Sequence, residues 1–500
     1  SFGGGTLQFS AANTTDYSAR FATATGQAYR LDTNGRDINL AANLSSSGGS
    51  LTKLGTGQLS LLGNSTYTGA TTVSAGTLKL TGTLNSNTDV VLNGTSVWDL
   101  QATQTVASLS MAPGSSITRT AGTSSLTVSG ASTLANSVST SGMQTYSGAV
   151  TLAAATSLSA STVRTGSTVN GAYALTINGN ADIDGTIGGL TALNSLSVTG
   201  TSKLGANVTT TGTQSYSGAV TLSGGDRSLN TDNSQITFGN TVNSEANQNR
   251  ALSLNVGTSK VQFDGVVGGT QGLGALAITG ALDLNAEIVS AASLSVSTTS
   301  DLAANVTTRG TQSYTGAVTL GSGNRVLTGD EIDWGSSFAG TGALTLRPAT
   351  TSRQMYLGAS TPMGAGLNLD AAELARLSDG FTSITLGHTT GTGGIETQGA
   401  TTFKDPVTFA AAGGTTVAHD LSATASTDAG FKFSKSLTWT GGNITTGTGA
   451  ITIVGDATLG GSGTRTMTTS SGSITVGSSV SNTVTGNGTN VTFFSESATT

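Results

Sequence analysis

The chain of 500 residues has no cysteine, two histidines, four prolines and few charged residues. Without cysteine it can form neither a disulfide framework nor a zinc site built on thiolates. Charged residues make up 9% of the chain, against about 25% in typical globular domains. Lysine and arginine number 20, and they occur singly rather than in clusters. Because phosphate binding needs a concentrated basic surface, the sequence predicts no nucleic-acid partner.

The sequence also lacks a long apolar segment. No run of 18 apolar residues occurs, so we predict no transmembrane helix. The first residue is Ser1 rather than methionine, and no basic segment followed by an apolar run comes after it. We therefore expect that a signal peptide has been removed or that the chain is a piece of a longer precursor.

What the sequence has is glycine, serine and threonine, with apolar residues that alternate almost from end to end. Glycine alone accounts for 71 residues. A chain rich in glycine and serine can be disordered. Alternation with a period of two is instead typical of strands with one buried face, and glycine suits the corners between them. The pattern therefore favours a repetitive β structure over a disordered chain.

One sequence segment occurs three times, at residues 141–152, 211–222 and 309–320. Each copy ends in Tyr-(Ser/Thr)-Gly-Ala-Val-Thr-Leu. Repeats of this kind indicate stacked coils in which each coil buries its apolar face against its neighbours. With coils of about 20–28 residues, the chain would make roughly 18–25 turns. We interpret the motif as a corner that sets coil geometry, and not as a ligand site.

Residues 48–80 read as strands separated by glycine corners. Period-two spacing would place six residues on one face, namely Leu51, Leu59, Leu61, Val73, Leu78 and Leu80. The segment contains Leu51-Thr52-Lys53, Gly55-Thr56-Gly57, Asn64-Ser65-Thr66-Tyr67-Thr68-Gly69 and Ala75-Gly76-Thr77-Leu78.

These landmarks closely resemble the autotransporter-associated β-strand repeat of bacterial autotransporter passenger domains. The resemblance implies a right-handed parallel β-solenoid outside the cell. Residues 130–400 are similar, less closely, to filamentous-haemagglutinin-like adhesins, through the repeated Tyr-Ser-Gly-Ala-Val-Thr-Leu stretch and the segment from Asp370 to Leu377.

A short insertion at 367–380 interrupts the β pattern. Asp370 and Glu373 have the spacing of a capping box, good helix formers follow, and Gly380 suits the end of a helix. We predict one or two helical turns near 370–377.

The predicted fold is all-β: one continuous right-handed parallel β-solenoid over residues 1–500. We divide it into N-terminal coils at 1–133, three long repeat units at 134–366, the helical insertion at 367–380, and C-terminal coils richer in aromatic residues at 381–500. In these last coils, Phe403, Phe409, Phe431 and Phe433 are expected to form core stacks rather than a sugar-binding platform.

Few residues suggest chemistry. His388 and His419 belong to no metal-ligand motif. The tightest carboxylate groups are Asp182 with Asp184, and Asp330-Glu331 with Asp333. Alternate residues on a strand share a face and could converge on a cation, but we interpret these groups as solvated strand faces. We therefore assign no catalytic, cofactor-binding or metal-binding residue and no cofactor.

The expected function is that of a non-enzymatic extracellular or bacterial cell-surface protein, a rigid stalk or adhesin-like scaffold. An alternative is a self-assembling subunit of an extracellular filament, sheath or surface layer, because open solenoid ends invite pairing with another chain. A remote alternative is a β-helix polysaccharide lyase or hydrolase. The expected partners are further copies of the chain, through the ends or sides of the solenoid, or a cell-surface or polysaccharide target.

Overall fold

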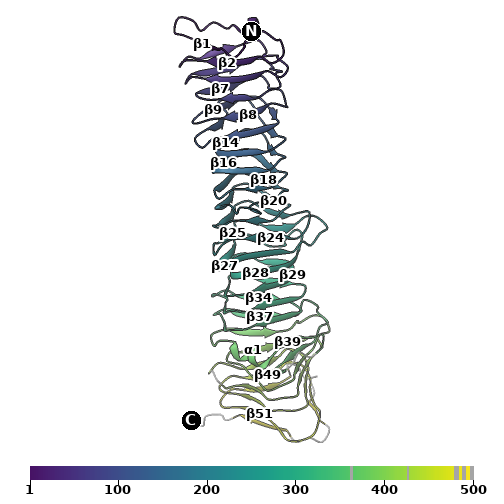
Figure 1. Cartoon of the computed structure of the whole chain (residues 1–500). Helices are drawn as coiled ribbons and strands as arrows, with labels where there is room; N and C mark the ends of the chain where they lie inside the picture. The colour runs from purple at the N-terminus through teal and green to yellow at the C-terminus, as the bar shows by residue number, and fades with distance from the viewer. Residues whose placement is uncertain (361–363, 425–426, 478–483, 487–490, 496–500) are drawn as a thin grey trace. The chain divides into compact units, whose positions relative to one another are not determined.

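A computed structural model of the chain describes residues 1–500 except 361–363, 425–426, 478–483, 487–490 and 496–500 (Figure 1). The protein is nearly all β and forms a parallel β-solenoid of about 23 turns with one short α-helix. The predicted fold class is therefore confirmed, and the number of turns lies within the predicted range. The described coils divide into two compact units, Ser1–Asn240 and Thr241–Thr500. The predicted division into repeat units remains a prediction.

The first unit begins with β1 (Thr6–Gln8), which pairs in parallel with β2 (Ala28–Asp32). Strand β2 pairs with β4 (Ser50–Leu54), which in turn pairs with β6 (Thr71–Val73). Each partner strand thus comes from the next coil. Inside residues alternate with outside residues along β2 and β4, as period-two spacing requires. In Figure 1 the strands of successive coils in this unit lie one above another.

Residues 48–80 supply β4, β5 (Gln58–Leu61), β6 and β7 (Thr77–Leu80). The six residues predicted to share a face are all at most 1% exposed. Gly76 shows why a corner needs glycine. Its φ is +66°, a conformation that residues with a Cβ atom rarely adopt. A Cβ there would also lie 2.5 Å from the carbonyl oxygen of Gly57, on the preceding coil.

The repeated motif forms a buried polar corner in each of its three copies. Each tyrosine hydroxyl donates to the glutamine Oε1 two residues earlier: Tyr146 to Gln144 at 3.1 Å, Tyr216 to Gln214 at 3.0 Å, and Tyr314 to Gln312 at 3.0 Å. The tyrosines are at most 1% exposed. Burial raises the pKa of each tyrosine hydroxyl above its usual value.

The glutamine amides complete these corners by donating to backbone carbonyl groups. The Nε2 atoms of Gln144, Gln214 and Gln312 donate to the carbonyls of Ser159, Asn230 and Thr328 at 3.0, 2.9 and 2.8 Å. Buried polar groups must find such partners, because an unpaired one is costly. The motif therefore shapes the corner from inside the coil.

A second repeated position leaves a buried hydroxyl without a partner. Ser132, Ser202 and Ser300 point inward, each opposite the valine of a repeat in the next coil. They are 2–3% exposed, and their Oγ atoms have no hydrogen-bond partner among the described residues.

Replacing Ser202 with alanine should therefore raise the stability of its coil by about 1 kcal/mol, because the desolvation cost of an unpaired hydroxyl is removed. Hydrogen exchange of the amides of β20 (Ser202–Leu204) and β23 (Val220–Leu222) would report the gain. The substitution Ser197→Ala, at an outward position on β19 (Ser195–Val198), is the control and should change little. Faster exchange in Ser202→Ala would contradict the prediction.

The C-terminal coils of the second unit contain an aromatic core. Strands β40 (Ser383–Leu386), β43 (Val407–Phe409) and β46 (Phe431–Phe433) stack in parallel register. The rings of Phe409 and Phe433 lie 4.9 Å apart and nearly parallel. Phe403, Phe409, Phe431 and Phe433 are all at most 2% exposed. They form core stacks, as predicted, and offer no surface to a sugar.

The predicted short helix is α1 (Ala371–Arg376). Asp370 is its N-cap, and the capping box with Glu373 is complete. The C-cap is Leu377, with extended backbone, so the helix lies within the predicted range near 370–377 and Gly380 follows just beyond it. Among the described residues, no helix has the length and apolar character needed to cross a membrane.

Candidate functional site

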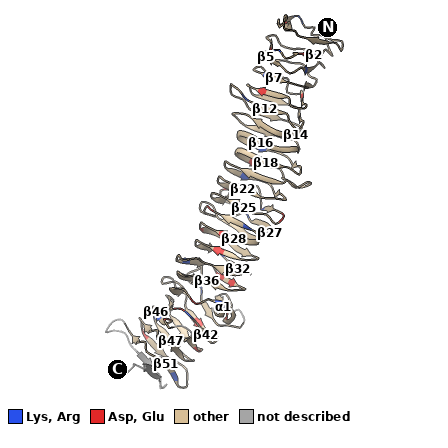
Figure 2. Cartoon of the chain, turned by 90° about the vertical axis from the view of Figure 1, so that its left-hand side faces the viewer, with Lys and Arg blue, Asp and Glu red and all other residues tan. Residues whose placement is uncertain are grey.

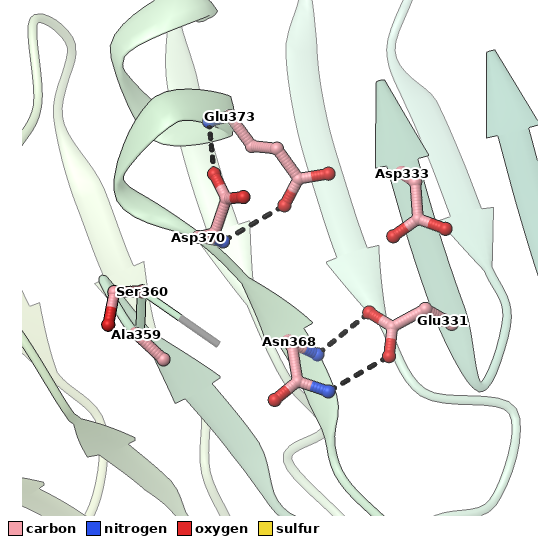
Figure 3. A pocket seen from close by; sticks show the side chains of 7 residues that line it. All are labelled: Glu331, Asp333, Ala359, Ser360, Asn368, Asp370 and Glu373. Carbon is pink, nitrogen blue, oxygen red and sulfur yellow. Dashed lines mark hydrogen bonds between the residues drawn. The ribbon is translucent and has the colours of Figure 1, made fainter. Parts of the chain in front are cut away.

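A hollow of about 200 Å³ lies beside α1 in the second unit (Figure 3). Its wall is formed by β35 (Glu331–Trp334), β39 (Leu367–Leu369) and the first turn of α1. The lining residues are mostly acidic or polar: Glu331, Asp333, Ala359, Ser360, Asn368, Asp370 and Glu373. Alternation along β35 places Ile332 and Trp334 in the core. Glu331 and Asp333 therefore face the hollow together.

Glu373 joins the helix to the strand. Its carboxylate accepts hydrogen bonds from the backbone N–H of Asp370 at 2.9 Å and of Trp334 at 3.2 Å. The indole Nε1 of Trp334 donates to the carbonyl oxygen of Glu373 at 2.9 Å. The Asp370 carboxylate in turn accepts from the backbone N–H of Glu373 at 2.7 Å. Glu373 is only 7% exposed, so it acts as both a cap and a buried cross-link.

Glu331 and Asp333 differ in their partners. Glu331 accepts two hydrogen bonds from Asn368, one from the backbone N–H and one from Nδ2, both at 2.9 Å. Burial raises the pKa of Glu331 above its usual value, although these hydrogen bonds oppose the rise. Asp333 accepts no hydrogen bond from the part of the chain that the structure describes. Figure 3 shows its carboxylate on the same side of the hollow as that of Glu331 and opposite the first turn of α1, which carries Glu373.

The environment keeps protons on this cluster at higher pH than usual. Burial, followed by the charges of Glu331 and Asp370, raises the pKa of Asp333 to about 6. Burial also raises the pKa of Glu373 to about 7, with smaller contributions from the charges of Asp370 and Asp333. The two hydrogen bonds that its carboxylate accepts favour the anion and oppose this rise.

Such a pair of carboxylates could exchange protons near neutral pH. One acid that is protonated beside another that is ionised is the arrangement used in acid–base catalysis on glycosides. A metal site would need at least three suitable side chains that converge on one point. The described residues include no group of three or more His, Cys, Asp or Glu side chains placed to hold a metal ion.

The other predicted acidic pair lies elsewhere, in the first unit. Asp182 and Asp184 share an outer face, where Arg164 and Lys203 come from the neighbouring coils. Arg164 lies 2.8 Å from Asp184, and Lys203 lies 3.3 Å from Asp182. The Arg164 and Lys203 side chains are about half exposed. This is the solvated strand face predicted from the sequence. Figure 2 likewise shows charged residues scattered singly along both units.

Asp330 is separated from its neighbours Glu331 and Asp333. Its carboxylate accepts from the backbone N–H and the hydroxyl of Thr350, and pairs with Arg353 at 3.5 Å. Each histidine contacts one carbonyl oxygen at 3.0 Å, that of Pro348 for His388 and that of Thr397 for His419. The structure therefore brings together Glu331, Asp333, Asp370 and Glu373, but neither Asp330 nor a histidine joins them.

The sequence interpretation did not identify one buried cation, Lys53. It is 0% exposed, and its Nζ donates to the Thr33 hydroxyl at 3.1 Å and to the carbonyls of Leu54, Gly55 and Ala75 at 3.1, 2.6 and 2.9 Å. Burial lowers its pKa to about 8, and the charge of Asp32 opposes the fall. The alternation of the strand could have identified it. Lys53 lies two residues after Leu51 and therefore on the same, inner face of β4.

Lys53 belongs to a recognisable family segment. Residues 51–80 match the family model of the passenger-associated-transport-repeat. The match confirms the resemblance to autotransporter passengers inferred from the sequence, and the β-solenoid is consistent with it. No curated protein and no solved structure matches the chain. In the structure, this transport repeat occupies β4 to β7 and continues the stack of coils without a break.

Proposed function

We propose that the protein is a non-enzymatic scaffold at the bacterial cell surface or outside the cell, a stalk or adhesin-like passenger. The observation that carries the proposal is the transport repeat built into the solenoid. Strands β4 and β5 pair with β2 and β3 (Ile38–Leu40) before the repeat. Strands β6 and β7 pair with β8 (Asp89–Leu92) and β9 (Val97–Leu100) after it. The repeat is thus part of the stack.

The composition supports the same proposal. Few charges, regular outward threonine and serine, and a buried polar corner in each long repeat suit a structure that has to be long and stable rather than chemically reactive. Solenoids of stacked coils present extended surfaces for binding.

The location of the protein in intact cells tests this proposal directly. Antibodies against the chain should label intact, unpermeabilised cells that produce the full protein, or detect it in the medium. An antibody against a cytoplasmic protein of the same cells is the control. Labelling that appears only after the cells are opened would contradict a surface scaffold.

Self-assembly is a second candidate, favoured by the first strand. Strand β1 is paired along one edge by β2, and Figure 1 shows it at the N-terminal end of the first unit. An unpaired strand edge is a template for another chain. Sedimentation over a range of concentrations should then show association, and Gln8→Lys, which puts a charge at an exposed position of this strand, should weaken it. Concentration-independent monomers would exclude assembly through this edge.

The remote alternative, a polysaccharide lyase or hydrolase, would depend on the acidic hollow. Incubation with uronate polymers and with neutral polysaccharides should give no products. Turnover that is lost in Asp333→Asn would contradict the non-enzymatic proposal.

A further inference from the structure

The helix α1 is held in place by its contacts and not by its own stability. It has six residues, whereas isolated helices shorter than about 12–15 residues are marginal in water. Its contacts include the buried Leu374, the pair of hydrogen bonds between Glu373 and Trp334, and a bond from Arg376 Nη1 to the Trp334 carbonyl at 3.1 Å. The contact between the first turn of α1 and β35 therefore contributes to keeping the helix docked, beside the bonds from Lys404 Nζ to the carbonyls of Ala375 and Leu377.

Four carboxylates meet at this junction: Glu331 and Asp333 from β35, and Asp370 and Glu373 from the start of the helix. None of them forms an ion pair with a described residue, and Arg353 pairs instead with Asp330 at 3.5 Å. Like charges at such a junction repel one another, and the partly buried setting strengthens the repulsion.

The cations on and beside α1 bond to backbone carbonyls and not to these four carboxylates. Arg376 donates to the Trp334 carbonyl, and Lys404 Nζ donates to the carbonyls of Ala375 and Leu377 at 3.3 and 2.8 Å. Arg353 acts on the cluster only from a distance, through Glu331. One further carboxylate, Asp405, accepts from the backbone N–H of Gly380 at 2.9 Å, just beyond the helix. It adds another negative charge on this side.

We propose that α1 is a pH-sensitive latch, which is docked on β35 while the carboxylate cluster holds protons and is released as the cluster becomes fully ionised. Asp333 is the main source of repulsion, because it accepts no hydrogen bond from a described residue that would compensate its charge. Release would open the hollow and expose the indole edge of Trp334.

The direction of the pH dependence follows from proton binding. The pKa values of Asp333 and Glu373, about 6 and about 7, exceed the usual values near 4. Burial, with smaller contributions from Asp379 and Asp428, raises the pKa of Asp405 to about 6 as well. The docked state thus binds protons more tightly than the released state. Docking is strongest below about pH 4 and weakens as the pH rises through 6 and 7.

Hydrogen exchange of the full chain tests the latch. The peptide spanning 370–378 contains the Leu374 amide, which donates to the Asp370 carbonyl at 3.0 Å. After correction for intrinsic exchange rates, and with EDTA present, its protection should fall about tenfold or more between pH 5 and pH 8, since each pKa unit corresponds to a factor of ten. Peptides from β32 (Thr311–Tyr314) should stay protected throughout.

Asp333→Asn is the decisive variant, because it removes a charge without removing a hydrogen bond. Protection of 370–378 at pH 8 should rise about tenfold relative to the unmodified chain, and its pH dependence should shrink. Asp301→Asn, on the exposed position of β30 (Ser300–Leu302), is the matched control and should leave both unchanged. Protection that does not vary with pH, or that falls equally in Asp333→Asn, would overturn the proposal. This variant leaves the capping box of Asp370 and Glu373 intact, so a change in protection does not come from loss of the helix cap.

Discussion

Replacing Lys53 by methionine should destabilise the coils around β4 by about 3 kcal/mol. Methionine has a similar length and can fill the same space, but it cannot donate to the four oxygens that Nζ contacts. Leaving buried carbonyls unpaired costs about 1–3 kcal/mol for each group. The relief from no longer burying a charge offsets part of this cost. Three successive coils contribute these oxygens, so the loss should loosen all three.

Hydrogen exchange of β2, β4 and β6 is the suitable measurement, because a stack of repeats need not unfold in a single step. The matched control is Lys79→Met in β7. Lys79 belongs to the same transport repeat but lies at an outward position. It should change protection by less than about 0.5 kcal/mol. Equal effects of the two substitutions would show that the Lys53 contacts contribute nothing specific.

Replacing Gln312 by leucine should destabilise the third repeated corner by about 3 kcal/mol. The substitution leaves the buried Tyr314 hydroxyl without its acceptor. It also removes the amide that donates to the carbonyls of Val306 and Thr328 at 3.3 and 2.8 Å. Each of these losses carries the desolvation cost of an unpaired buried group.

Gln144→Leu and Gln214→Leu should have similar effects, because the same tyrosine–glutamine bond is present at all three corners. Ser313→Ala, at the outward position between Gln312 and Tyr314, is the control. Exchange of β31 (Val306–Thr308), β32 and β34 (Arg325–Thr328) would report the loss. A stable Gln312→Leu variant with unchanged exchange would mean that the corner is held by its apolar packing alone.

Local patterns in the sequence determined the fold class. Alternation with a period of two puts Leu51 and Val73 on the apolar face of their strands. Because side chains alternate along any strand, this face can be recognised without knowing which strands lie beside it. The capping pair Asp370 and Glu373 predicts the helix for a similarly local reason, because both partners lie within one turn. The transport repeat was recognisable for the same reason, as its landmarks lie within about 30 residues of one another.

The tertiary structure decided which side chains meet. Glu373 bonds to Trp334 across 39 residues, and Asn368 bonds to Glu331 across 37. Lys53 joins Thr33, 20 residues before it, to Ala75, 22 residues after it. Such contacts depend on coil length and on the register between neighbouring coils, which a one-residue shift would change. The acidic cluster beside α1 and the buried lysine therefore emerge only when the coils are stacked.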